Sequence, residues 1–377
     1  MIYFDNAATT YIKPGEVYRA IYENMLKYGA NAGRGGHSLS VKAGELINET
    51  RERLCELFGI DNMERLAFFQ NATHAINTGI KGVLERGDHV VTTSMEHNAV
   101  LRPLAELKRR GIIEYTTVKG NDMGEISIND FEKAIRYRTK LIVMTHASNV
   151  CGNIYDICAI SKLVRRPGTL FLVDAAQSAG LIDIDVSCLD LLAFPGHKGL
   201  YGPQGSGGLY VREGITLKTI MEGGTGSQSE LLYQPEEMPD RLECGTLNVP
   251  AIAGLGAAVD FILEEGTNSI FEQEDMLTKY FEEKIKNISN IEIYGDTLKT
   301  GVTALNIKNM DCVDVADALN RKYGIAIRSG LHCAPSAHKT LGTIDSGCVR
   351  FSFGFFTTKK ELDQAVFSLS EIAKKGV

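Results

Sequence analysis

Leu170-Phe171-Leu172-Val173-Asp174 is a run of four apolar residues that ends in an aspartate. Such a run is typical of a strand covered on both faces, as the strands of a parallel sheet are. Similar short runs alternate with helical patterns through the first two thirds of the chain, which predicts a mostly parallel α/β sheet. We expect seven strands, at Arg65–Gln70, His89–Ser94, Ile113–Val118, Lys140–His146, Leu170–Ala175, Leu189–Phe194 and Gly208–Val211, with helices between them such as Thr73–Leu84, Ala99–Arg110 and Ile157–Arg166.

The pattern changes near residue 250, where the regular alternation ends. The later segments predict a smaller α+β domain. We expect a large domain over 13–262 and a small domain that combines 1–12 with 263–377. The expected helices of this last part are Ala251–Glu265, Ile270–Asn287, Val313–Tyr323 and Lys359–Lys374, and the expected strands are Ile291–Tyr294, Val302–Ile307, Ile325–Arg328 and Val349–Phe353.

Composition narrows the class of protein. The 377 residues carry 40 basic and 47 acidic side chains, a net charge of −7, which argues against a general nucleic-acid binder. The hydrophobic fraction of 44% is ordinary for a soluble globular enzyme. No apolar run approaches the roughly 18 residues of a membrane-spanning helix, and the first residues do not resemble a signal peptide. We therefore expect a cytoplasmic protein without membrane contact.

The cysteines form no recognisable metal or redox motif. None of the eight stands in a CxxC pair, and Glu96-His97 has no HExxH partner, so no metal site is expected. Without a secretion signal the thiols are expected to be reduced, and most to be small buried apolar groups. The eight are Cys55, Cys151, Cys158, Cys188, Cys244, Cys312, Cys333 and Cys348.

A lysine follows the strand predicted over Leu189–Phe194. Residues 193–205 read Ala-Phe-Pro-Gly-His-Lys-Gly-Leu-Tyr-Gly-Pro-Gln-Gly, a stiff, irregular loop that lets a ligand approach the backbone. A lysine in an apolar or cationic setting has a lowered pKa and can form a Schiff base. Lys198 is therefore a candidate nucleophile, although a surface lysine beside turn glycines is an equally good reading of this loop alone.

Polar residues follow three other predicted strands. Ligands gather at the carboxyl ends of parallel strands, and Asp174 there could keep a pyridine nitrogen protonated, as pyridoxal phosphate (PLP) requires. Thr73 stands where a helix begins and could bind a phosphate. His97 could lie on an aromatic cofactor and move protons. Taken singly, each also fits an ordinary role, as a helix cap for Asp174 or Thr73 and as a structural histidine for His97.

A cysteine with basic neighbours occurs near the end of the chain. In Arg328-Ser329-Gly330-Leu331-His332-Cys333-Ala334-Pro335, Arg328 and His332 flank Cys333. Positive neighbours stabilise a thiolate, the nucleophilic form of the side chain. Cys333 is therefore a candidate nucleophile, whereas the other seven cysteines are expected to have no part in chemistry.

In their order along the chain, these segments resemble the class V aminotransferase family, and within it the branch of cysteine desulfurases and selenocysteine lyases. The opening Tyr3-Phe4-Asp5-Asn6-Ala7-Ala8-Thr9-Thr10 and the segment Arg34-Gly35-Gly36-His37-Ser38 are similar to that family as well. The cysteine segment resembles the group II desulfurase motif, with Leu331 in place of the first of two histidines. Pro195 stands where the family often has a hydroxyl residue that contacts the cofactor phosphate.

The resemblance implies a fold-type I PLP-dependent enzyme and assigns a role to each residue. Lys198 would carry PLP as a Schiff base and move the substrate Cα proton. Asp174 would pair with the pyridine nitrogen, Gln177 would bind the ring hydroxyl and His97 would stack on the ring. The phosphate would be bound by Thr73, by His197 and, across a homodimer interface, by the partner's copy of Thr246. Asn149 would lie near the ring oxygen of the cofactor and near the substrate carboxylate. Arg350 and Arg328 would also bind the substrate, with Arg350 holding its carboxylate.

The reaction implied is the conversion of L-cysteine to L-alanine, with a persulfide on Cys333 that passes to an acceptor, which could be a protein. Selenocysteine lyase chemistry would use the same cofactor, and the sequence does not separate the two substrates. A class V aminotransferase or another PLP lyase, in which Cys333 has no role, is an alternative. A non-catalytic sulfur-carrier scaffold is a further alternative, against which the joint presence of Lys198, Asp174, His97 and Arg350 argues.

Overall fold

A seven-stranded sheet forms the centre of the larger part of the computed structural model, which describes residues 1–32, 36–295 and 298–375. The strand order is β2-β8-β7-β6-β5-β3-β4. The neighbouring pairs from β7 to β4 are parallel, whereas β8 runs antiparallel to both β7 and β2. The strands are β2 (Leu66–Phe68), β3 (His89–Thr93), β4 (Glu114–Val118), β5 (Thr139–Thr145), β6 (Leu170–Asp174), β7 (Leu191–Pro195) and β8 (Gly207–Val211). The mostly parallel, seven-stranded α/β sheet predicted from the sequence is confirmed, each strand within two residues at either end.

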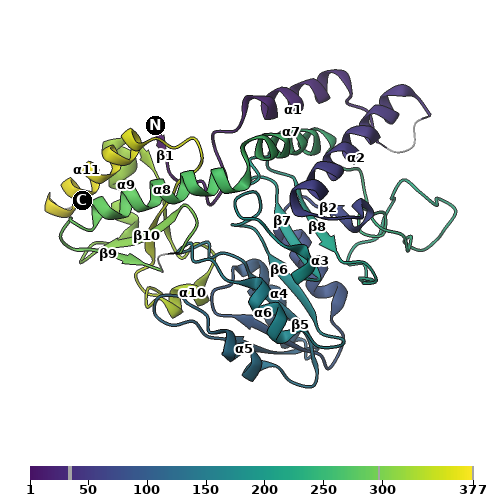
Figure 1. The fold of residues 1–377 in the computed structure, drawn as a ribbon, viewed down its shortest axis with the longest axis horizontal. Helices are drawn as coiled ribbons and strands as arrows, with labels where there is room; N and C mark the ends of the chain where they lie inside the picture. Colours follow the sequence, from purple (N-terminus) through teal and green to yellow (C-terminus); the bar gives the residue numbers. More distant parts are fainter. Residues whose placement is uncertain (33–35, 296–297, 376–377) are drawn as a thin grey trace.

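Side chains alternate between the two faces of this sheet, and each face has its own apolar core. Phe171 and Val173 of β6 pack in one core, with helices α2, α5, α6 and α7. Leu172 packs in the other core, with α3 and α4. These helices are α2 (Ser38–Phe58), α3 (Ala72–Val83), α4 (Asn98–Arg109), α5 (Ile128–Ala134), α6 (Ile157–Val164) and α7 (Val249–Glu265); α1 (Gly15–Lys27) packs beside α7 (Figure 1).

A four-stranded antiparallel sheet of order β12-β13-β10-β9 forms the smaller part. Its apolar core contains Phe4 together with residues from 277 to 372, so the first residues of the chain pack with the last. Both termini lie at this end of the molecule, and α8 crosses toward the large sheet (Figure 1). The elements are α8 (Thr267–Ile285), β9 (Ile291–Tyr294), β10 (Val302–Ile307), α9 (Cys312–Tyr323), β12 (Arg328–Gly330), α10 (Pro335–Thr340), β13 (Cys348–Ser352) and α11 (Lys359–Lys375).

Two details differ from the expected elements. The strand expected over Ile325–Arg328 is divided into β11 (Ile325–Ala326), which pairs with β1 (Ile2–Tyr3), and β12, which pairs with β13. The sequence analysis assigned no helix to α1, α2, α5 or α10. Arg34 and Gly35, part of one segment of the resemblance, lie outside the described residues. No helix within the described ranges is long and apolar enough to cross a membrane.

Candidate active site

A cavity of about 230 Å³ lies at the carboxyl ends of β5, β6 and β7, against the beginnings of α3 and α4 and against β12 and β13. The large part of the chain supplies one side of the cavity and the segment after residue 325 supplies the other. Almost all the predicted site residues line it, namely Thr73, His97, Asn149, Asp174, Gln177, His197, Lys198, Arg328 and Arg350. Residues more than 250 positions apart in the sequence are therefore brought to one site.

Lys198 stands in the tight turn that follows β7. The backbone N–H of Tyr201 donates to the carbonyl of Lys198, and a Cβ on Gly199 would come within 2.6 Å of the Ala179 carbonyl oxygen, so this turn needs glycine. Desolvation, with smaller contributions from Arg350 and Arg328, lowers the pKa of Lys198 to about 8. No described residue accepts a hydrogen bond from its Nζ. The amine is thus partly neutral near neutral pH and free to react.

Asp174 lies at the end of β6, 2% exposed, with one carboxylate oxygen accepting from the N–H of Ala176 at 2.9 Å. Burial raises its pKa, while Lys198 acts in the opposite direction. Gln177 is fixed by a bond of 3.0 Å from its amide to the carbonyl of Ala7. The cavity therefore holds a buried carboxylate and an oriented amide on the same wall.

His97 lies at the beginning of α4, where its Nδ1 accepts from the N–H of Ala99 at 3.0 Å. Burial, then the charges of Lys198 and Arg328, lowers its pKa to about 4. The ring is therefore a neutral imidazole, held in one orientation by its bond to the helix. A neutral ring of fixed orientation suits stacking on a flat ligand.

Thr73 does not begin its helix, contrary to the sequence analysis. The cap of α3 is Asn71, whose side chain accepts from the N–H of His74 at 2.9 Å, and the helix starts at Ala72. An asparagine is as good a cap as a threonine, so the cap preference alone did not distinguish them. The Thr73 side chain is exposed at the cavity, where its hydroxyl can serve a ligand.

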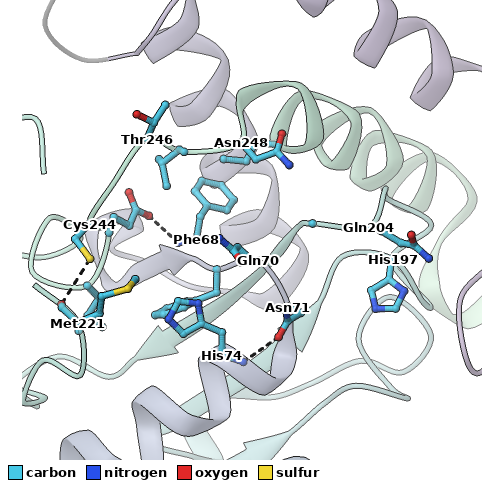
Figure 2. A pocket seen from close by; sticks show the side chains of 16 residues that line it. Phe68, Gln70, Asn71, His74, His197, Gln204, Met221, Cys244, Thr246 and Asn248 are labelled. Carbon is cyan, nitrogen blue, oxygen red and sulfur yellow. Dashed lines mark hydrogen bonds between the residues drawn. The ribbon is translucent and has the colours of Figure 1, made fainter. Parts of the chain in front are cut away.

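His197 separates the cavity from a second pocket of about 540 Å³. Its Nδ1 is buried, and no described residue forms a hydrogen bond with it. Figure 2 shows His197 on one side of this second pocket and Thr246 on the opposite side. Thr246 does not line the cavity that contains Lys198.

Arg350 of β13 is 1% exposed and already has two partners. Its Nη1 donates to the carbonyl of Asn149 at 2.8 Å, and its Nη2 pairs with Asp5 at 2.7 Å. Its Nε is buried and has no partner within the described residues. The guanidinium is thus held rigidly with donor capacity left, and Asp5 is a site residue to which the sequence analysis gave no role.

Cys333 is exposed and does not line the cavity, although its neighbours Arg328 and His332 do. Its Sγ lies 3.5 Å from Nη2 of Arg328, which places it at the edge of the site. Its carbonyl accepts from the N–H of Asn98 at 2.8 Å, and the Asn149 amide donates to the carbonyl of His332 at 2.7 Å. Hydrogen bonds to two of its backbone carbonyls therefore tie this loop to the segment after β5 and to the beginning of α4.

His332 does not supply positive charge beside Cys333, contrary to the sequence analysis. It is 2% exposed, and its ring turns away to His338, 3.2 Å from Nδ1 to Nε2. Burial and the charge of Arg350 lower its pKa to about 2, so the imidazole is neutral. Arg328 is the cation that contacts the thiol.

Two cysteines also differ from expectation. Cys158 of α6 and Cys188 form a disulfide, because the loop before β7 brings Cys188 to the first turn of α6, with the two Cα atoms 5.1 Å apart. The expectation of reduced thiols throughout is therefore wrong for this pair. Cys55, Cys151, Cys312 and Cys348 are buried thiols, as expected, and Cys244 is partly exposed.

Comparisons with known proteins identify the family of this chain. The family model described as aminotransferase class-V matches residues 2–365. A probable cysteine desulfurase of Methanothermobacter thermautotrophicus is 36% identical over the whole of this chain and 95% of its own length. A cysteine desulfurase of Salmonella agona is 32% identical over 99% of this chain and 93% of its own.

A solved structure of a cysteine desulfurase has the same fold. The apo structure of a cysteine desulfurase from Thermococcus onnurineus superposes with a TM-score of 0.93 at 34% identity. The superposition covers 99% of this chain and 94% of that one. By family model, sequence identity and fold, the chain belongs to the aminotransferase class-V family.

Proposed function

We propose that this protein is a PLP-dependent cysteine desulfurase, which converts L-cysteine to L-alanine and leaves the sulfur as a persulfide on Cys333. The observation that carries the proposal is the meeting of Lys198, Asp174, His97 and Arg350 in one cavity, with an exposed cysteine at its edge. Relatives named cysteine desulfurase at 32–36% identity over nearly the full length support the same reaction.

The donor set of the cavity fits PLP. The side chain of Lys198 has no competing bond among the described residues, Asp174 is buried at a strand end, and the Nδ1 of His197 lacks a partner. Thr73 and the first N–H groups of α3 offer an anion site for the phosphate, and this supports the proposal although Pro195 brings no hydroxyl. Bound PLP supplies an electron sink for the substrate Cα.

The chain's own residues would then perform distinct tasks. Arg350, held by Asp5 and Asn149, binds the substrate carboxylate, with Arg328 and Asn149 beside it. The Lys198 amine, with its lowered pKa, holds or releases a proton near neutral pH. Gln177 and His97 bind and cover the flat ring. Because Cys333 is exposed, a sulfur atom on it can be passed to an acceptor outside the site.

The sulfur transfer balances without an added oxidant. The bond between Cβ and sulfur of L-cysteine breaks, a sulfur–sulfur bond forms at Cys333, and a proton completes the methyl group of L-alanine. The thiol of an acceptor then takes the outer sulfur and regenerates Cys333. The product of the first half is thus one L-alanine and one persulfide per turnover.

We also propose that the site is completed in a homodimer. Thr246 faces a separate pocket and not its own chain's cavity, which agrees with a role at a partner's phosphate. Exposed apolar side chains cluster on α1, where Tyr18, Tyr22, Met25 and Leu26 are each more than half exposed. Such a patch is typical of an interaction surface. A mass in solution near twice 41.3 kDa is expected, and an active monomer would contradict the dimer.

The division of the chain into 13–262 and a second domain of 1–12 with 263–377 remains our proposal. The separate apolar core that contains Phe4 and residues 277–372 supports it.

The test of function is a paired assay with L-cysteine and L-selenocysteine. Equal amounts of L-alanine and transferable sulfur from L-cysteine, together with a yellow lysine-bound cofactor that borohydride bleaches, are expected. Alanine from selenocysteine alone would make the protein a selenocysteine lyase. Amino-group transfer to a 2-oxo acid would make it an aminotransferase, and a colourless, inactive protein would make it a scaffold.

A further inference from the structure

A second group of reactive side chains lies behind the Cys333 loop. It contains His332 of that loop, His338 of α10 and Cys348 at the start of β13, with exposed fractions of 2%, 0% and 1%. One nitrogen or sulfur atom from each residue meets the others, and the three atoms lie within 4.8 Å of one another. The task of Cys333 proposed above uses none of these three side chains.

Two of the distances between these atoms are close to the ligand–ligand distances of a tetrahedral metal site. Nδ1 of His332 lies 3.2 Å from Nε2 of His338 and 3.9 Å from Sγ of Cys348. With ordinary zinc–ligand lengths, two nitrogens in a tetrahedral site are about 3.3 Å apart, and a nitrogen and a sulfur about 3.6 Å apart. The third distance, between His338 and Cys348, is within 4.8 Å.

Each histidine also has the outer contact that is typical of a metal ligand. Nε2 of His332 lies 3.5 Å from the carbonyl of Arg328, and Nδ1 of His338 lies 2.8 Å from the hydroxyl of Thr343. Histidines that bind a metal almost always donate their other N–H to such an oxygen, which fixes the ring. Nδ1 of His332 thus contacts both the second histidine and the thiol, which brings one imidazole nitrogen from each histidine and the sulfur together.

We propose that His332, His338 and Cys348 form a buried binding site for a zinc-type divalent cation. Zinc binding releases the Cys348 thiol proton to solvent as the sulfur–zinc bond forms, and no group is oxidised or reduced. A water molecule takes the fourth position. Thiolate and imidazole ligands select zinc over magnesium or calcium, which prefer oxygen ligands.

The site would hold the Cys333 loop from behind. His332 and Cys333 both have positive backbone φ angles, 50° and 56°, which are strained for residues other than glycine. Fixing the His332 side chain opposes relaxation of this backbone and keeps Cys333 at the cavity edge. The role is structural, because none of the three ligand atoms belongs to the reacting groups proposed above.

The experiment measures zinc bound to the PLP-loaded protein in a Cys333→Ala background, which removes the exposed thiol. No thiol reductant is added, so that Cys158 and Cys188 stay paired. Zinc is titrated against a chelator, and one zinc per chain is expected. Cobalt in place of zinc is expected to show thiolate-to-cobalt charge-transfer absorption.

The two ligand variants Cys348→Ser and His338→Gln are each expected to weaken zinc binding by at least about a hundredfold, since loss of outer contacts alone costs about 10–100-fold. Cys55→Ser removes a buried thiol of α2 outside the cluster and is expected to leave zinc affinity unchanged. The proposal is overturned if the background protein holds no more zinc than the ligand variants do. A cobalt spectrum without a thiolate band overturns it as well, even if Cys348→Ser fails to fold.

Discussion

The segments around Lys198 and Cys333 differ in how far they expose their reactive side chain to solvent. Lys198 follows a buried strand, in a turn so tight that Gly199 has no room for a side chain, and its amine is enclosed by the cavity. Cys333 stands exposed in a loop held by backbone bonds, with a positive φ angle. A group that bonds a cofactor benefits from desolvation, which lowers its pKa, whereas a group that passes sulfur onward needs to be reached from outside. Cofactor binding and sulfur transfer should therefore be separable by mutation.

The largest effect is expected at the lysine. Lys198→Ala removes the amine that bonds PLP and moves the Cα proton, and should reduce alanine release by about a thousandfold or more, since proton transfer alone contributes about 10²–10⁴. The yellow absorption should be lost as well. Lys218→Ala, an exposed lysine paired with Glu85, is the matched control. Turnover near the wild-type rate in Lys198→Ala would refute the assignment.

A substitution of Cys333 should remove sulfur transfer but leave cofactor binding intact. Cys333→Ala should lose at least about a hundredfold in sulfur release from L-cysteine, because it lacks the sulfur nucleophile. Its cofactor absorption should stay as in the wild type, because Cys333 does not line the cavity.

The control for the cysteine variant is Cys244→Ala, a partly exposed thiol outside the site, which should remain active. Mass spectrometry after brief exposure to L-cysteine should find one added sulfur on the peptide with Cys333. An added sulfur on Cys244 or Cys348 instead would contradict the persulfide mechanism.

The pH dependence of cofactor uptake should report Lys198 alone. Its pKa is lowered to about 8. Below that pH, the fraction of Lys198 in the reactive neutral form rises about tenfold per pH unit, and above it nearly all of the lysine is neutral. The rate at which the apo protein forms a borohydride-reducible bond with PLP should therefore rise up to about pH 8 and then level off. A rate that keeps rising to pH 10 would mean that the lysine is not desolvated.

The smallest effect compares two helix caps. Asn71 caps α3 beside the cavity and Asp311 caps α9 in the smaller part, each by a side-chain bond to a backbone N–H. Asn71→Ala and Asp311→Ala should each lower the free energy of unfolding by about 1 kcal/mol, measured by urea denaturation. Only Asn71→Ala should weaken PLP binding. Equal PLP affinity in both variants would mean that the beginning of α3 does not bind the phosphate.

Several elements could be predicted because their signal is local. The apolar runs within β5, β6 and β7 are typical of strands buried on both faces, and the polar residues that follow them mark the ligand edge of a parallel sheet. Nothing in the local sequence predicts that β8 runs antiparallel, since the apolar pattern of a strand does not depend on its direction in the sheet. The histidine and cysteine cluster has no local signal either, because five and nine residues separate its members.

The sheet, the lysine and aspartate at its edge, and the family can all be inferred from residue types in a fixed order along the chain. Which charged groups contact one another depends on the three-dimensional fold. It turned His332 inward, where burial keeps its ring neutral, and left Arg328 as the cation at the thiol of Cys333. It also brought Asp5 to Arg350 across 345 positions of sequence, since electrostatic and desolvation effects depend on distance in space and not along the chain.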